Sequence, residues 1–166
     1  MTEISVRMGE LATTADEGAV LVSIGLGSCI GLALVDAGAR VAGLAHIMLP
    51  GPGGDSGARP PGTFADTGVF ALLDAMIVSG ARRMRLSAVI VGGAQMFGSG
   101  GQMQVGQRNE EAVRAALRAA RVPIVGAETG GGSGRTIRVH LDDMRVTARI
   151  AGAPVNILLG GLVVAA

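Results

Sequence analysis

The sequence predicts a single α+β domain spanning residues 1–166, in which mixed or antiparallel sheets carry two to three helices packed on one side. Three observations lead to this class. The 166 residues show no linker and no internal repeat, and short apolar runs outnumber segments with helical periodicity. The predicted helices do not alternate regularly with the strands. Hydrophobic residues make up 49% and aromatic residues only 2%, so the core must be aliphatic, while 28 glycines indicate many turns.

The first half of the chain alternates between apolar runs and turn residues. Gly and Asp bound three runs that predict strands at 20–24, 29–35 and 41–49. Residues 50–62 are too rich in Pro and Gly for regular structure. A helix is then expected up to Gly80, with Thr63 as its N-cap and Asp66 as the reciprocal partner of that cap.

The second half contains one more expected helix. Residues 109–120 place apolar side chains on one face and arginines on the other. Further strands are predicted at 85–91, 124–127, 135–141 and 145–150. The apolar segment 150–166 is shorter than the ~20 residues of a membrane-spanning helix and is expected to form buried strand and turn.

Composition and charge exclude several classes of function. A net charge of +1 is too weak to gather nucleic acid or a membrane surface. The N-terminus lacks a signal peptide and the single cysteine cannot form an intrachain disulfide, so a cytoplasmic location is expected. No cofactor is expected, because no lysine can serve a phosphate loop. A metal site is disfavoured, because Cys29, His46 and His140 are the only Cys and His residues.

Cys29 directly follows the glycine-rich segment 25–28 (GLGS). A lone thiol on a tight turn is typical of a cysteine nucleophile. Glycines at 25 and 27 permit positive φ and close approach of a substrate, and backbone N–H groups of the turn are expected to face an oxyanion beside the sulfur. The alternative is that Cys29 is a small buried hydrophobe.

A second residue, His46, is predicted to lie opposite this thiol. A two-residue turn at Ala37 and Gly38 predicts a β-hairpin in which Cys29 faces His46, with Cβ atoms about 4.5–5.5 Å apart. The imidazole would then take the thiol proton and stabilise the thiolate. Ser23, on the preceding strand, is the expected third group and would accept a hydrogen bond from the ring. The alternative is that His46 is an ordinary core histidine.

Six short motifs, in order along residues 5–150, resemble those of CheD, the chemoreceptor glutamine deamidase family of bacterial and archaeal chemotaxis. They are 25–29 (GLGSC), 46–50 (HIMLP), 64–66 (FAD), 92–97 (GGAQMF), 106–109 (GQRN) and 130–135 (GGGSGR). This resemblance implies a Cys–His deamidase, in which Cys29 attacks the carboxamide of a receptor glutamine, His46 moves the protons and ammonia leaves. Ser23 aligns with the position of a catalytic Thr in the family.

The resemblance also implies partners and a fold. The substrates would be the helical cytoplasmic domains of methyl-accepting chemotaxis receptors, and a CheC-type phosphatase would be a binding partner. The fold would be similar to the catalytic domain of the cytotoxic necrotising factor toxins. Three residues depart from the family pattern, where Glu, Lys and Tyr are common: Gln107, Val89 and Phe64.

Two other functions remain open. The chain could be a non-catalytic module that binds receptors or CheC, or another cysteine enzyme such as an acyl transferase. Retention of Cys29, His46 and a hydroxyl at Ser23 favours the deamidase.

Overall fold

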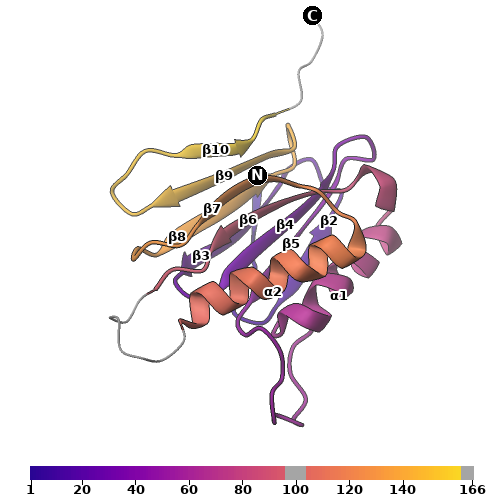
Figure 1. Ribbon diagram of the computed structural model, residues 1–166. Helices are drawn as coiled ribbons and strands as arrows, with labels where there is room; N and C mark the ends of the chain where they lie inside the picture. The colour runs from indigo at the N-terminus through magenta and orange to yellow at the C-terminus, as the bar shows by residue number, and fades with distance from the viewer. Residues whose placement is uncertain (96–103, 162–166) are drawn as a thin grey trace, which may run out of the picture.

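The computed structural model describes residues 1–95 and 104–161. Within these residues two five-stranded sheets lie face to face. Two α-helices pack on one of these sheets, on the face that points away from the other sheet (Figure 1). The α+β class and the placement of the helices on one side are therefore confirmed. The finer likeness to the cytotoxic necrotising factor domain stays a prediction.

The two sheets are named by their place in this three-layer arrangement. The inner sheet, between the helices and the other sheet, has the order β2 (Leu11–Thr14), β5 (Val41–Ile47), β4 (Ile30–Asp36), β6 (Ser87–Gly92) and β7 (Ile124–Thr129). The outer sheet has the order β1 (Thr2–Ser5), β3 (Ala19–Leu26), β8 (Arg135–His140), β9 (Arg145–Ile150) and β10 (Asn156–Leu159). Neighbours are antiparallel except for β1–β3 and β6–β7, so both sheets are mixed.

The inner sheet is buried on both faces, which explains why its central strands read as continuous apolar runs. In β4, Leu32 and Leu34 pack toward the helices, while Ala33 and Val35 pack toward the outer sheet. Helices α1 (Ala65–Val78) and α2 (Val105–Ala120) supply the other side of the first core layer. Among the described residues both layers are built from aliphatic side chains and methionine, in agreement with the low aromatic content.

Several element boundaries differ from those predicted. The short strands β1 and β2 were not expected, because neither TEIS nor LATT carries an apolar alternation strong enough to indicate a strand. A 3₁₀ turn, η1 (Arg83–Arg85), precedes β6, and α2 begins before the predicted Asn109.

The predicted cap of the first helix is wrong. Phe64 occupies the N-cap position with no side-chain cap bond, and the Thr63 hydroxyl donates instead to the carbonyl of Pro60 at 2.7 Å. Backbone contacts replace the cap, since the N–H of Ala65 donates to the carbonyl of Leu49 at 2.8 Å. The loop at 50–62 thereby returns the chain to the end of β5.

The predicted hairpin register is also wrong, by two residues. Asp36 pairs with Val41, so the connection has four residues rather than two, and Gly31 rather than Cys29 lies opposite His46. The cause is the buried Asp36 carboxylate, which accepts the N–H of Ala39 at 3.1 Å and shapes a wider turn. A slip of two keeps the alternation of faces, so His46 still points toward the outer sheet.

Some predicted features lie outside the described residues. These are Met96 and Phe97 of the fourth motif, the glycine-rich segment 98–101, Met103, and residues 162–166 of the apolar segment. The described part of that segment, predicted to be buried strand and turn, forms the strand β10, but this strand is exposed or half-buried, so the expected burial is wrong. In the described part, no helix combines the length and the apolar character needed to span a bilayer.

Candidate active site

Cys29 ends the short connection between β3 and β4. Its side chain is half-buried and packs against the core layer between the two sheets. That layer is also the one into which His46 points, because Ala45 and Ile47 on either side of it pack toward the helices. The structure therefore places both predicted residues in the same layer of the molecule.

Three donors hold the carbonyl groups of the turn at residues 27–29, which we call the nucleophile turn after the role predicted for Cys29. The carbonyl of Gly27 accepts the N–H of Ala94 at 2.9 Å, and the carbonyl of Cys29 accepts the N–H of Gly93 at 2.9 Å. The carbonyl of Ser28 accepts a third bond, from a side chain discussed below. By contrast, the N–H groups of residues 27–29 donate to no other described residue. Among the described residues the turn is thus held through its carbonyls, and none of these residues accepts a bond from its N–H groups.

The GGA motif explains how the loop after β6 comes so close to this turn. Gly92 has φ of 113°, and a Cβ at this position would overlap the carbonyl oxygen of Cys29. The buried Arg135 braces the same loop, since its Nη1 donates to the carbonyl of Gly130 at 2.8 Å and approaches that of Gly92 at 3.4 Å. The motifs that begin at Gly92 and at Gly130 are far apart in the sequence, but both support the turn at residues 27–29.

Asn109 is the functional-site residue that sequence reasoning missed. Its Nδ2 donates to the carbonyl of Ser28 and to the carbonyl of Met48, each at 2.9 Å, and its side chain is fully buried. Both partners can only accept, so the amide group must face them with its NH₂ end. One side chain on α2 thus clamps the nucleophile turn to the end of the strand that carries His46. The only sequence signal was its place in the motif at 106–109.

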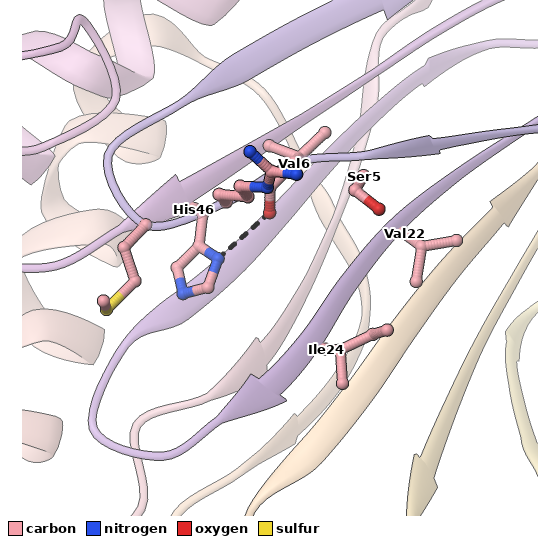
Figure 2. A pocket seen from close by; sticks show the side chains of 7 residues that line it. Ser5, Val6, Val22, Ile24 and His46 are labelled. Atoms are coloured by element: carbon pink, nitrogen blue, oxygen red, sulfur yellow. Dashed lines mark hydrogen bonds between the residues drawn. The ribbon is translucent and has the colours of Figure 1, made fainter.

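The hydrogen bond made by His46 determines its tautomer. Nδ1 lies 3.1 Å from the carbonyl oxygen of Val6 (Figure 2). A carbonyl only accepts, so in the neutral ring Nδ1 carries the proton and Nε2 keeps its lone pair. Burial lowers the pKa of His46, against smaller raising effects from Val6 and the Glu10 charge. The residue is therefore a neutral base at neutral pH.

Ser23 takes a different partner from the one expected. Its Oγ donates to the carbonyl oxygen of Val6 at 2.7 Å rather than accepting from the ring of His46. The serine and the histidine therefore converge on the same backbone oxygen. Ser23 acts on the imidazole only through Val6, whose carbonyl it helps to hold in place.

The protonation states of Cys29 and His46 differ from the expected ion pair. Burial raises the pKa of the Cys29 thiol above its ordinary value of 9.0, and no hydrogen bond joins this thiol to His46 within the described residues. A raised thiol pKa and a lowered imidazole pKa both favour the neutral forms. In the absence of substrate, the pair is a thiol and a neutral imidazole.

A pocket of about 380 Å³ opens beside His46. Its walls come from β3 and from the segment that follows β1, and Figure 2 shows Ser5, Val22 and Ile24 around it. His46 itself is only 4% exposed. The ring thus lies at the bottom of the pocket rather than at its rim.

His140 stands apart from this site. It lies in β8 on the solvent side of the outer sheet, with Nε2 3.3 Å from the Thr147 hydroxyl. Across residues 1–95 and 104–161, no three Cys, His, Asp or Glu side chains gather as a potential metal site.

Known proteins similar to this chain point to one family. The model of the CheD family, described as CheD chemotactic sensory transduction, matches residues 48–150. "Probable chemoreceptor glutamine deamidase CheD" of Symbiobacterium thermophilum is 42% identical over 152 residues, which cover 89% of this chain and 92% of that protein. "Probable chemoreceptor glutamine deamidase CheD 2" of Anaeromyxobacter dehalogenans is 40% identical over 151 residues, 90% and 95% of the two chains.

A solved structure, Neisseria meningitidis protein NMB0706 of family-model DUF152, is far more distant. It is 9% identical with a TM-score of 0.42, over 78% of this chain and 63% of that one, a likeness too weak to support an argument. The family match and the relatives are much stronger, since they extend over most of both sequences. The chain therefore belongs to the CheD family of chemotactic sensory transduction.

Proposed function

We propose that this protein is a protein-glutamine deamidase that acts on methyl-accepting chemotaxis receptors through Cys29 and His46. The observation that carries the proposal is the bond from His46 Nδ1 to the Val6 carbonyl, because it leaves Nε2 as a proton acceptor in the layer that holds the thiol. The names of the relatives, probable chemoreceptor glutamine deamidases, supply the substrate class.

The proposed reaction begins with the neutral pair. Nε2 of His46 takes the proton of the Cys29 thiol as the sulfur attacks the carboxamide carbon of a glutamine. The carbonyl π electrons move to the oxygen and give a tetrahedral oxyanion. The imidazolium then protonates the departing nitrogen, the C–N bond breaks, and ammonia leaves a thioester on Cys29.

Hydrolysis returns the enzyme to its starting state. His46 takes a proton from water as the water oxygen attacks the thioester carbon, and the C–S bond breaks. The sulfur regains its proton from the imidazolium, and the product is glutamate. The net change is one carboxamide and one water converted to one carboxylic acid, which then ionises, and one ammonia.

The N–H groups of the nucleophile turn, which donate to no described residue, would bind the oxyanion of both tetrahedral states. Their carbonyl groups are held by Gly93, Ala94 and Asn109, so the N–H groups do not have to reorganise during the reaction. Preorganised donors of this kind are among the largest contributions to acyl-transfer catalysis. Ser23 has a positioning role, because it binds the carbonyl that fixes the tautomer of His46.

Partners and location follow from the same proposal. The receptors' cytoplasmic helices would be the substrates, and the protein would work in the cytoplasm. A CheC-type phosphatase as a second partner, and the likeness to the cytotoxic necrotising factor catalytic domain, are parts of the family expectation that belong with this proposal.

Mass spectrometry of a receptor cytoplasmic fragment tests the function. Wild-type protein should add about one dalton per converted glutamine, the difference between NH₂ and OH, and Cys29→Ala should add nothing. Binding without conversion by the wild type would contradict the deamidase and favour the non-catalytic module. Incorporation of an added primary amine at the glutamine, in place of hydrolysis, would instead identify an acyl transferase.

A further inference from the structure

One face of the outer sheet is covered by neither of the two described α-helices, because α1 and α2 both lie against the inner sheet (Figure 1). The solvent-facing positions of its central strands are polar or basic. They are Thr136, Arg138 and His140 in β8, and Arg145, Thr147 and Arg149 in β9. We call these six residues the arginine face.

Two of the three arginines on this face form no salt bridge with a described residue. Neither Arg138 nor Arg149 has a carboxylate within salt-bridge distance among the described residues, whereas Arg145 pairs with Asp143 in the turn that joins the two strands. Arg149 Nε donates to the carbonyl of Ala153 at 3.0 Å, which holds its guanidinium over the sheet. The face therefore presents positive charge that no described carboxylate neutralises by a salt bridge.

Exposed aliphatic side chains border the charged residues. Val155 is 55% exposed and Ile157 62% exposed beside β9, and Ile24 is 64% exposed at the end of β3. Ile24 is exposed because β3 departs from regular pairing with β8 between Ser23 and Leu26. Such irregularities redirect side chains and are frequent beside active sites.

Ile24 connects the arginine face to the active site. It lines the pocket that has His46 at its bottom, and it also lines a second pocket of about 540 Å³ that contains Arg138 and Arg149. Gly25, at the start of the glycine-rich turn, lines this second pocket as well. The arginine face and the His46 pocket thus share the side chain of Ile24, so a ligand that lies along the face would reach the pocket by passing this residue.

We propose that the arginine face docks an amphipathic helix of the substrate that carries acidic side chains next to the target glutamine. Arg138 and Arg149 would bind the carboxylates, and Ile24 and Ile157 would contact the apolar side of the helix. The interspersed aliphatic residues favour a protein partner over nucleic acid, and the overall net charge of +1 agrees. This inference rests on the proposed function for the identity of the helix, a receptor segment.

The decisive variant is Arg138→Gln with Arg149→Gln. A matched control is Arg82→Gln with Arg118→Gln, because these exposed arginines lie just before η1 and on α2, away from the outer sheet, and form no ion pair among the described residues. Binding is measured by calorimetry in the Cys29→Ala background, so that turnover does not change the ligand. The probes are a helical receptor cytoplasmic fragment and the same fragment with the acidic residues beside its target glutamine changed to Gln.

The expected result is about five- to tenfold weaker binding of the acidic fragment to the Arg138/Arg149 variant, since exposed charge pairs contribute little each. The control pair should bind like the wild type, and the neutralised fragment should bind both proteins equally weakly. With Cys29 restored, the variant should raise KM by a similar factor and leave kcat unchanged. Equal binding by the variant and the control, or tighter binding of a DNA duplex than of the fragment, would overturn the inference. If binding depends on the two arginines but the wild type deamidates nothing, the docking surface is supported and the proposed function is wrong.

Discussion

Asn109→Ala tests how the active site is assembled. The substitution removes the Nδ2 group that joins the carbonyl of Ser28 to the carbonyl of Met48, with both bonds at 2.9 Å in a fully buried position. The pairing of Ile30 with Ile47 joins the adjacent strands, but no other described side chain joins the carbonyls of the nucleophile turn to the end of β5. The variant should therefore lose both stability and turnover.

The expected loss of stability can be estimated from the contacts. A buried hydrogen bond contributes about 1 kcal/mol net, and a buried carbonyl left without a partner costs about 1–3 kcal/mol. Two carbonyls of half-buried residues lose this partner, but the buried Oδ1 of Asn109, which has no partner among the described residues, is removed as well. The net loss should be about 2–3 kcal/mol, or about 5–10 °C in the midpoint of thermal unfolding.

Urea unfolding followed by far-UV circular dichroism measures this loss, since the chain has no Trp or Tyr to report by fluorescence. Gln107→Ala on the same helix is the control, because it removes an exposed bond of 3.1 Å to Glu111 and should change stability by about 0.5 kcal/mol or less. Turnover of Asn109→Ala should fall about tenfold or more, because the thiol and the imidazole lose their common support. A stability within about 0.5 kcal/mol of the wild type would refute the clamp.

Three further predictions concern the charges and bonds around Cys29 and His46. Ser23→Ala should lower kcat severalfold while thermal unfolding stays cooperative, because it removes one of two donors to the Val6 carbonyl; unchanged kcat would exclude Ser23 from the site. The value of kcat/KM should stay level as the pH falls to about 6.5 and should decline only below that pH. The reason is that activity is lost when the ring of His46 is protonated, and burial lowers the pKa of this ring. An inflection above pH 6.5 would contradict this. Alkylation of Cys29 by iodoacetamide should be slow at pH 7 and accelerate as the pH rises through 9, because burial raises the thiol pKa; a rate at pH 7 above that of free cysteine would show that the thiolate is already formed.

The amino-acid sequence by itself determined the class of fold and the family, and it named the candidate residues Cys29 and His46. Aliphatic runs bounded by glycine specified β4 and β5 as buried strands, because strands buried on both faces carry no polar alternation. A single cysteine behind a glycine-rich turn and a histidine on a following strand were visible without coordinates. Both point into the same layer because a β-strand alternates its faces with a period of two, which a two-residue error in register leaves unchanged.

Only the tertiary structure decided how those residues are held. The Val6 carbonyl receives both Ser23 and His46 from segments distant in sequence, and no local pattern encodes such a meeting. The turn at residues 37–40 depends on the Asp36 carboxylate, which is buried by contacts with Arg82 and Arg85 that the hairpin sequence does not contain. Hydrogen bonds from side chains to backbone atoms far along the chain form only when the layers have packed. For that physical reason the tautomer of His46, the bonds of Asn109 and the register of β4 and β5 could not be predicted from the sequence.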